Sequence, residues 1–540
     1  MPASPVLLRR RIQLADRSAD KVHFALVGGP IGEGTVTKYI GGALIPTLQV
    51  DRGDATNLSM QLATHLRELI LSGDLPPGTR LPASRVLAVE QGVSRTTAVA
   101  AYEQLTSEGL LVSRVGAGTY ISDDVRPPPA RLTPSPTARL PRLANISHEL
   151  SEQYFPRLEH PSSPRPFVTG MPAIDAFPMA MWARLSARYW RGARSEIMSY
   201  PDALGLPKLR EAISRHLRAN RGVVCQADEV FVFAGAQDGF MQIAQILLDP
   251  GDRVWMENPG AIGARNAFLS RGADLVPVPV DGEGLDVAAA RRLCPDMRMA
   301  FVTPAHQHPL GCTMSRDRRF ELLAAAEESG AWIVEDDYVG EFHYGRQPLP
   351  PLKALDGGGR VLYVGTFSKA LFPAIRLGYA VVPPALVASF ERALSAVAHG
   401  VSNAIQSIVA DFIAEGHFSS HLRRMRDLYR GRRDALMDAA DRHLGGMLAL
   451  SPTDTGFHTI GLLPPGLDER TVAEAVKTAG LAMAPLSRFA LSPLAVQGLT
   501  LGFSAVSPQE IDRGVARLAE VLRRTERDRP GSGRTPARRS

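Results

Sequence analysis

Two short segments in the second half of the chain carry residue types that could perform covalent chemistry. One is Val-Glu-Asp-Asp-Tyr at 334–338, and the other is Gly-Thr-Phe-Ser-Lys at 365–369, with Arg376 shortly after it. Each segment lies at the end of an apolar, strand-like run, and open α/β sheets bind their ligands at the carboxyl ends of strands. A lysine in such a place can form a Schiff base with an aldehyde when its pKa is lowered. Lys369 is therefore the candidate catalytic residue.

Neighbouring residue types indicate which aldehyde this lysine would meet. A carboxylate such as that of Asp336, facing a pyridine nitrogen, keeps the ring protonated and makes it an electron sink. Arg376 and the Thr366 hydroxyl could hold a phosphate, as could the backbone N–H groups of Ala236 and Gln237 at the start of a predicted helix. An aldehyde, a pyridine and a phosphate together define pyridoxal 5′-phosphate (PLP). The alternative is structural, because Ser-Lys pairs are common on surfaces and Asp-Asp after a strand is often a helix cap. The occurrence of all these pieces in order favours the cofactor.

The pattern around these segments predicts the elements that position them. From about residue 167, apolar runs alternate with helical patterns, which favours an α/β fold with a mainly parallel sheet. The strand-like runs are 230–233, 254–256, 275–280, 299–302, 332–334, 361–364 and 377–382. Helical patterns include 239–248 and 318–328, and the chain turns helical from 403 to about 444. A smaller α+β region follows and ends in a helix at 508–523.

A second pattern near the N-terminus predicts a separate small domain. Leu58, Leu62 and Leu66 mark one helical face, and a short helix fits 84–91. Ser94 can cap a third helix that runs to about residue 108. Two strands at 110–114 and 119–121 follow, joined by Gly-Ala-Gly. Three helices and a β-hairpin form the outline of a winged helix-turn-helix, whose recognition helix enters the DNA major groove.

The placement of arginines supports this interpretation. Arg95 begins the predicted recognition helix between Ser94 and Thr96; an Arg can bind guanine in a bidentate way, and hydroxyls suit phosphates or base edges. Gly116 at the wing tip lets the backbone approach DNA closely. Residues 55–122 nevertheless hold five Arg, no Lys and five acids, so the basic surplus typical of DNA binding is missing. A small helical domain with ordinary surface arginines is the alternative.

Composition limits the remaining classes. The 540 residues are 45% hydrophobic and 21% charged, which is typical of a globular chain and excludes a coiled coil, a collagen and a wholly disordered protein. Three cysteines without a CxxC pair disfavour a disulfide scaffold and a cysteine-rich zinc site. No apolar run approaches a membrane span, and the Arg-rich start lacks an apolar signal core. We therefore expect a cytoplasmic, nucleoid-associated protein without membrane contact.

The patterns divide the chain into five parts. We expect a partly disordered extension over 1–50, the winged helix over 51–124, a Pro-rich linker over 125–165, the α/β domain over 166–525, and a basic, disordered tail over 526–540. The net charge of the chain is +6, and the C-terminal arginines contribute to it. They could touch DNA phosphates, but a solvated tail is the favoured interpretation.

The N-terminal motif resembles the winged helix of the GntR family. The resemblance is carried by Leu-Pro-Ala-Ser-Arg at 81–85, Gly-Val-Ser-Arg-Thr-Thr at 92–97 and Ala-Tyr-Glu-Gln-Leu at 101–105. It implies a double-stranded DNA operator as partner. By position, the contacts of the family with DNA fall on Arg85, Ser94, Arg95, Thr96 and Gly116. Some members carry a further contacting Arg later in the recognition helix; its place is taken here by Val99.

The whole chain resembles the MocR/GabR subfamily of GntR regulators, which join this winged helix to a fold-type-I aminotransferase-like domain. Tyr-Pro-Asp at 200–202 and Glu-Asn-Pro-Gly at 257–260 match its pattern. The resemblance implies that Lys369 carries the Schiff base with PLP, that Asp336 pairs with the pyridine nitrogen and that Tyr338 pairs with the ring hydroxyl. It also implies that the phosphate is held by Arg376, Thr366, Ala236 and Gln237. Tyr200 would reach the phosphate across the interface of a homodimer, which the family forms as a domain-swapped, head-to-tail pair.

Three departures from the aminotransferase pattern bear on function. Ala261 stands where the family has a Tyr beside the cofactor ring. His308 stands where aminotransferases place an Asn that bonds the ring hydroxyl, which makes His308 a candidate cofactor contact. Thr500 stands at, or one residue from, the place of the Arg that holds the substrate carboxylate, and a hydroxyl is a poor substitute for a bidentate guanidinium. Arg488 could approach from a loop. His306 and His308 lack further ligands for a metal, so we expect no metal site.

These observations lead to one main hypothesis and two alternatives. We expect a DNA-binding transcriptional regulator whose aminotransferase-like domain binds PLP and senses PLP itself or an amine or amino-acid effector. The first alternative is an active PLP-dependent aminotransferase with an appended DNA-binding module, which Thr500 disfavours. The second is a regulator whose enzyme-like domain serves only for dimerisation, which the complete set of Lys369, Asp336 and Arg376 disfavours.

Overall fold

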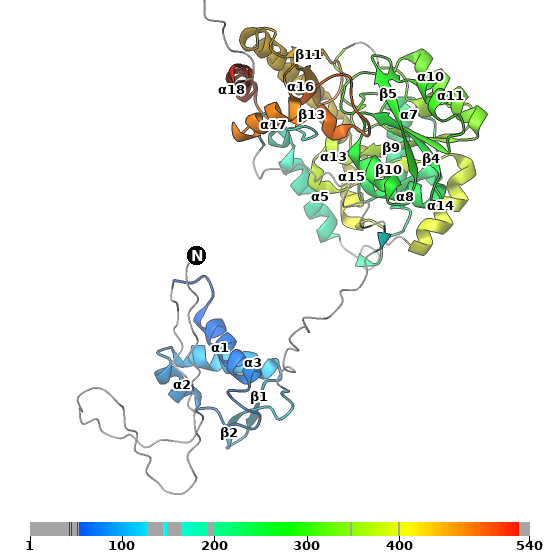
Figure 1. The fold of residues 1–540 in the computed structure, drawn as a ribbon. Helices are drawn as coiled ribbons and strands as arrows, with labels where there is room; N and C mark the ends of the chain where they lie inside the picture. The colour runs from blue at the N-terminus through cyan, green and yellow to red at the C-terminus, as the bar shows by residue number, and fades with distance from the viewer. Residues whose placement is uncertain are drawn as a thin grey trace, which may run out of the picture. The chain divides into compact units, whose positions relative to one another are not determined.

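The computed structural model of the chain describes residues 43, 45, 51, 53–126, 144, 145, 147, 164–192, 198–345, 348–397 and 400–528. The chain forms two compact units, residues 1–141 and 142–540. Figure 1 shows both units and labels many of their helices and strands. The Pro-rich linker expected over 125–165 falls for the most part outside the described residues. Among the helices that are described, none is long and apolar enough to cross a membrane.

The first unit has the predicted winged-helix outline. Its helices are α1 (Leu58–Ser72), α2 (Ser84–Glu90) and α3 (Arg95–Ser107), and its strands are β1 (Leu111–Arg114) and β2 (Gly118–Ile121). The two strands pair antiparallel, and Gly116 in the turn between them adopts φ of 74°. Leu62, Leu66 and Ile70 form the buried face of α1 and pack with α2, α3 and the hairpin in one core. Amphipathic spacing thus gives each helix one side to bury.

Two residues of the N-terminal extension belong to this unit. Ile45 is 7% exposed and packs into the core of the winged helix. The backbone N–H of Ala43 donates to the carbonyl of Arg80 at 2.9 Å. Residues 43 and 45 lie in no helix or strand, and the rest of the extension expected over 1–50 lies outside the described residues.

The second unit is built on an eight-stranded sheet in the order β3-β10-β9-β8-β7-β4-β5-β6. Its strands are β3 (Val230–Phe233), β4 (Arg253–Asn258), β5 (Asp274–Asp281), β6 (Gly284–Leu285), β7 (Met299–Val302), β8 (Trp332–Asp336), β9 (Val361–Thr366) and β10 (Gly378–Val381). The five strands from β9 to β5 run parallel, whereas β10 and β6 are antiparallel to their neighbours. The prediction of a mainly parallel sheet is confirmed. Burial on both faces explains why these strands read as continuous apolar runs.

Helices cover both faces of this sheet. The helices that precede and follow the strands are α5 (Met179–Arg191), α7 (Pro207–Arg221), α8 (Ala236–Leu247), α9 (Ile262–Leu269), α10 (Val287–Leu293), α11 (Arg316–Ser329), α12 (Leu352–Leu355), α13 (Phe367–Ala370) and α14 (Pro384–Val397). Phe240 of α8 and Phe390 of α14 share a core with Phe301, whereas Leu322 of α11 packs with Trp255 and the opposite face. Figure 1 shows α10 and α11 on one side of the sheet and α8 and α14 on the other. The sheet is therefore the central layer of three.

The C-terminal part is a smaller α+β layer, as the sequence predicts. It contains α15 (Asn403–Ala414), α16 (His417–His443), β11 (Ala449–Leu450), β12 (His458–Leu462), α17 (Glu469–Thr478), β13 (Ala484–Pro485), β14 (Gly498–Gly502) and α18 (Pro508–Arg527). The helical stretch expected from 403 is two helices, because Gly416 between them adopts φ of 78°. The last helix, which Ser507 and Glu510 cap reciprocally, runs to Arg527. The tail expected from 526 therefore begins inside a helix.

Candidate functional site

A cavity of about 500 Å³ opens at the carboxyl ends of β8 and β9. It is lined by all of the predicted cofactor-site residues except one: Lys369, Asp336, Tyr338, Thr366, Arg376, Ala236, Gln237 and His308. Segments far apart in sequence meet here because parallel strands end at the same edge of the sheet. The exception is Tyr200, which is 96% exposed and does not line the cavity.

Lys369 lies one turn beyond the end of β9. The Thr366 hydroxyl accepts a hydrogen bond from the Ser368 N–H at 3.2 Å and so caps the short helix α13, which carries the lysine. The ammonium group of Lys369 donates to the carbonyl of Gly170 at 2.7 Å. Burial lowers the pKa of Lys369 to about 8, and the opposing charge of Asp336 only partly offsets this effect. At pH 7 about a tenth of the amine is therefore neutral and nucleophilic, which is far more than in an ordinary exposed lysine.

Asp336 is the last residue of β8 and is 7% exposed. Burial, together with the negative charge of Asp337 beside it, raises the pKa of Asp336 well above its ordinary value. Its Oδ1 atom has no hydrogen-bond partner among the described residues. Tyr338, two residues further, donates its hydroxyl to the carbonyl of His306 at 3.0 Å. The cavity thus contains a buried carboxyl that a positively charged or N–H-bearing ligand would satisfy.

The cavity also reaches the N-terminus of a helix. Helix α8 begins at Ala236 after Gly235, which adopts φ of 94°. Arg376 adopts φ of 47°, in the left-handed region that side chains rarely occupy. A Cβ on Gly235 would lie 3.4 Å from the Arg376 guanidinium, and one on Gly378 would lie 2.8 Å from the Ala236 nitrogen. These glycines let the guanidinium and the N-terminus of α8 approach each other, which forms a cradle for an anion.

The side wall carries residues that the sequence analysis did not single out. His458 of β12 lines the cavity beside His308, with ring centroids 5.3 Å apart. Burial and the neighbouring His458 hold the pKa of His308 well below its usual range, so the ring is neutral. Gly170 also lines the cavity and accepts from Lys369. No motif marks His458 or Gly170 in the sequence. No cluster of three or more His, Cys, Asp or Glu suited to a metal ion occurs in the described part of the chain.

Besides His308, which lines the cavity, the departures from the aminotransferase pattern have different structural outcomes. Ala261 lines the cavity, so the aromatic ring expected there is replaced by open space. Thr500 is fully buried in β14, where its hydroxyl pairs with the backbone of Ala484, and it does not reach the cavity. Arg488 lies in the turn Leu486–Phe489 and does line the cavity. Arg488, unlike Thr500, therefore brings a guanidinium to the cavity wall.

The predicted DNA contacts occupy one region of the first unit. The Ser94 hydroxyl accepts from the Thr97 N–H at 3.1 Å and caps α3, the recognition helix of the winged-helix outline. The side chains of Arg85, Arg95 and Thr96 are exposed near the N-termini of α2 and α3. Gly116 is exposed in the turn of the hairpin. Exposed guanidinium and hydroxyl groups at the start of a recognition helix are the groups that read base edges and phosphates.

Comparison with known proteins assigns both units. Residues 58–121 match the model of bacterial regulatory proteins of the gntR family, and residues 172–518 match the model of aminotransferases of class I and II. The chain is 39% identical over 88% of its length to the probable rhizopine catabolism regulatory protein MocR of Rhizobium meliloti, of which the match covers 96%. It is 33% identical over 87% of its length to the HTH-type transcriptional regulator TauR of Rhodobacter capsulatus, of which 98% is covered.

Solved structures match the second unit. The α-aminoadipate aminotransferase LysN of Thermus thermophilus, solved with N-(5′-phosphopyridoxyl)-L-leucine, is 27% identical, covers 71% of this chain and 96% of its own, and gives a TM-score of 0.62. The first unit is thus a GntR-type DNA-binding domain, and the second has the fold-type-I aminotransferase fold. The chain belongs to the MocR/GabR subfamily of GntR transcriptional regulators, which join these two domains.

Proposed function

We propose that the second unit binds PLP covalently through Lys369 and that the regulator responds to PLP or to an amine or amino acid that reacts with it. The observation that carries the proposal is the cavity in which Lys369, Asp336 and Arg376 meet. LysN, which shares the fold, was solved with a phosphopyridoxyl amino acid. When bound, PLP supplies an aldehyde that bonds to amines and a ring that accepts electrons.

The residues present fit this cofactor. The unpartnered Oδ1 of Asp336 suits a protonated pyridine nitrogen, which would also supply the charge that lets this buried carboxyl ionise. The glycines at 235 and 378 leave a cradle at α8, where Arg376, Thr366 and the N–H groups of Ala236 and Gln237 would hold the phosphate. His308 would contact the cofactor from the side wall as a neutral hydrogen-bonding group. Tyr200 would reach the phosphate of the partner subunit in a head-to-tail, domain-swapped homodimer.

The DNA side of the proposal follows from the first unit. We propose that Arg85, Ser94, Arg95, Thr96 and Gly116 contact the operator, with Arg95 reading a base edge. A homodimer would bring two such readers to two half-sites. An effector can change this arrangement only if its affinity differs between the DNA-binding and non-binding states. The cavity would therefore act as the sensor and the winged helix as the output.

The direct test is an absorption spectrum of the purified full chain during titration with PLP, followed by a panel of amines and amino acids. The proposal expects a saturable, covalent cofactor spectrum, which one amine changes persistently without release of a keto acid. If no amine reacts and PLP binds reversibly, PLP itself is the signal. Sustained release of keto acid would instead identify an aminotransferase, and absence of any cofactor spectrum would refute the proposal.

The pH dependence of cofactor capture provides a sharper test of Lys369. Because burial lowers the pKa of Lys369 to about 8, its reactive neutral form accumulates as pH rises and is nearly complete above pH 9. The rate of covalent PLP capture by the cofactor-free chain should rise through a midpoint near pH 8 and then level off. Stopped-flow absorbance measures this rate. A rate that climbs without a plateau to pH 10 would show that an ordinary, exposed lysine is the one that reacts.

Substitution of Arg488 should reveal whether the effector carries a carboxylate. Arg488→Ala removes the guanidinium from the cavity wall, and a hydrogen bond from a charged donor contributes about 1.5–3 kcal/mol. We expect an amino-acid effector to lose roughly 10- to 150-fold in affinity, while the matching amine without a carboxylate is unaffected. Spectral titration with both ligands measures the two affinities. Arg292→Ala, on the exposed face of α10, is the control; equal losses for both ligands in Arg488→Ala would contradict the assignment.

A further inference from the structure

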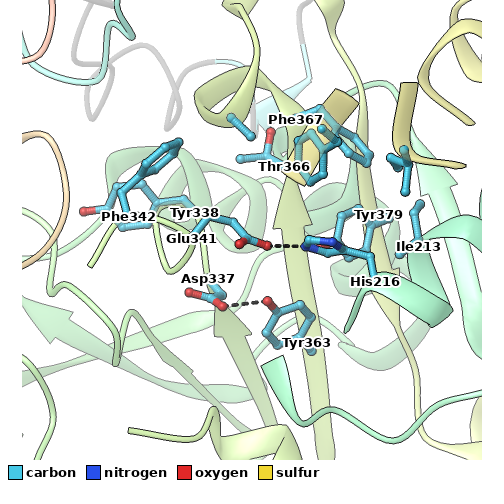
Figure 2. A pocket seen from close by; sticks show the side chains of 13 residues that line it. Ile213, His216, Asp337, Tyr338, Glu341, Phe342, Tyr363, Thr366, Phe367 and Tyr379 are labelled. Atoms are coloured by element: carbon cyan, nitrogen blue, oxygen red, sulfur yellow. Dashed lines mark hydrogen bonds and ion pairs between the residues drawn. The ribbon is translucent and has the colours of Figure 1, made fainter. Parts of the chain in front are cut away.

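A small second cavity lies directly behind the cofactor-site residues. Its volume is about 20 Å³, and Tyr338 and Thr366 border both cavities. A space of this size holds about one water molecule and no organic ligand. Its lining includes two carboxyl groups among apolar and aromatic side chains: Figure 2 shows Asp337 joined to the Tyr363 hydroxyl, and Glu341 joined to His216. Asp337, Tyr363, Glu341 and His216 thus form an internal polar cluster around the small cavity, whereas Asp336 lines the main cavity.

Asp337 is the centre of this cluster. The Arg221 guanidinium, from the last residue of α7, lies 2.5 Å from its Oδ2 atom, and the Tyr363 hydroxyl donates to the same atom at 2.6 Å. The side chains of Asp337 and Arg221 are only 2% and 6% exposed. Arg221 also donates to the carbonyl of Gly340 at 2.7 Å. A Cβ on Gly340 would lie 1.9 Å from Asp337 Oδ1, so the chain leaves space for this ion pair by having no side chain there.

The ion pair between Arg221 and Asp337 affects the ionisation of Asp336 in the cofactor site. Asp336 and Asp337 are consecutive and both buried, and two carboxylates this close cannot both ionise at low cost unless a positive charge compensates one of them. Arg221 provides that charge on the side away from the main cavity. Without it, Asp336 and Asp337 would be two buried carboxyls that share a single negative charge, because a buried carboxylate without a partner takes up a proton. Asp336 would then carry that charge only in competition with Asp337 and would stabilise a protonated pyridine nitrogen less well.

We propose that Arg221 is a positioning residue for the PLP site: by neutralising Asp337 it leaves Asp336 free to carry the negative charge that keeps the pyridine nitrogen of the cofactor protonated. This inference rests on the proposed function. It adds a residue that the cofactor does not touch, from a helix that contributes no side chain to the main cavity.

A double-substitution cycle on the full chain tests the inference. The variants are Arg221→Met, Asp337→Asn and the combination of both. The control is Arg432→Met. It removes another buried arginine, which pairs with Asp175 and does not line the main cavity. One unit in the pKa of Asp336 corresponds to a factor of about ten in its ionisation. We expect Arg221→Met to weaken equilibrium PLP binding about tenfold or more and the combined variant to restore most of the loss, because it removes the carboxyl that competes with Asp336 for the negative charge.

The state of the pyridine nitrogen separates electrostatic from structural effects. The ¹⁵N chemical shift of labelled PLP should report a protonated nitrogen in the original chain, the combined variant and Arg432→Met, and a less protonated one in Arg221→Met. Thermal unfolding of the cofactor-free variants reports whether each is folded. A nitrogen as fully protonated in Arg221→Met as in the original chain, or a combined variant no better than Arg221→Met, would overturn the inference while leaving PLP binding intact. A chain that binds no PLP at all would refute the proposed function, and this inference with it.

Discussion

Replacing Lys369 by Ala is expected to abolish covalent attachment of PLP and the regulatory response, while specific DNA binding by the first unit persists. Lys369 places its amine in the cavity, and burial lowers its pKa to about 8, which favours the nucleophilic form. The backbone around it is held by the Thr366 cap and by pairing of β9, so removal of the side chain leaves the site otherwise assembled. Borohydride reduction followed by mass spectrometry of the digested chain measures the attachment and its position.

Lys353→Ala is the matched control for this experiment. Lys353 is also partly buried, burial also lowers its pKa, and its ammonium donates to the carbonyl of Val361, but it does not line the cavity. It should retain the full adduct at Lys369. A normal cofactor adduct in Lys369→Ala would show that another amine carries the cofactor and would contradict the assignment.

Replacing Arg95 by Ala is expected to weaken specific operator binding by about 1–3 kcal/mol, the usual contribution of a base contact. Arg95 is the first residue of α3 and is exposed, and the Ser94 cap fixes the direction in which the helix begins. The loss should be much smaller for unrelated DNA, because non-specific binding depends on phosphate contacts. Fluorescence anisotropy at fixed salt, with an operator selected from random DNA by the full chain, measures both affinities.

Arg67→Ala provides the control for Arg95. Arg67 lies on α1 and pairs with Glu108 at 2.6 Å, away from the start of the recognition helix. Its removal should leave the ratio of specific to non-specific affinity unchanged. If Arg95→Ala lowers both affinities by the same factor, Arg95 contacts a phosphate instead of a base. If neither affinity changes, Arg95 has no role in binding.

The elements that could be predicted from the sequence are those with a strong local signal. The strands at 230–233 and 299–302 have the expected bounds because both are short, fully apolar runs with all residues buried. Lys369, Asp336 and the start of α8 could be placed at one edge because each follows a strand of the same sheet. Helix ends were less accurate: α18 extends to Arg527, because neither glycine nor proline occurs between residues 523 and 529.

The parts of the site that could not be predicted depend on long-range packing. His458 and Gly170 enter the cavity from segments that no motif connects to Lys369. Arg488 reaches it from a turn, whereas Thr500, which matched the aminotransferase arginine by position, is directed into the sheet around β14. The contact between Arg221 and Asp337 joins residues more than a hundred positions apart. Such long-range contacts depend on tertiary structure, and the local periodicity of the sequence carries no information about them.

The central claim is that occupancy of the cavity changes how the chain binds DNA. Its most direct test is the affinity of the full chain for its selected operator, measured without PLP, with PLP, and with PLP plus each amine that alters the cofactor spectrum. We predict that one of these additions changes operator affinity by roughly 5- to 150-fold, the usual range of coupling between two sites, and that Lys369→Ala removes the change. Equal affinity under all three conditions, with the cofactor demonstrably bound, would contradict the account.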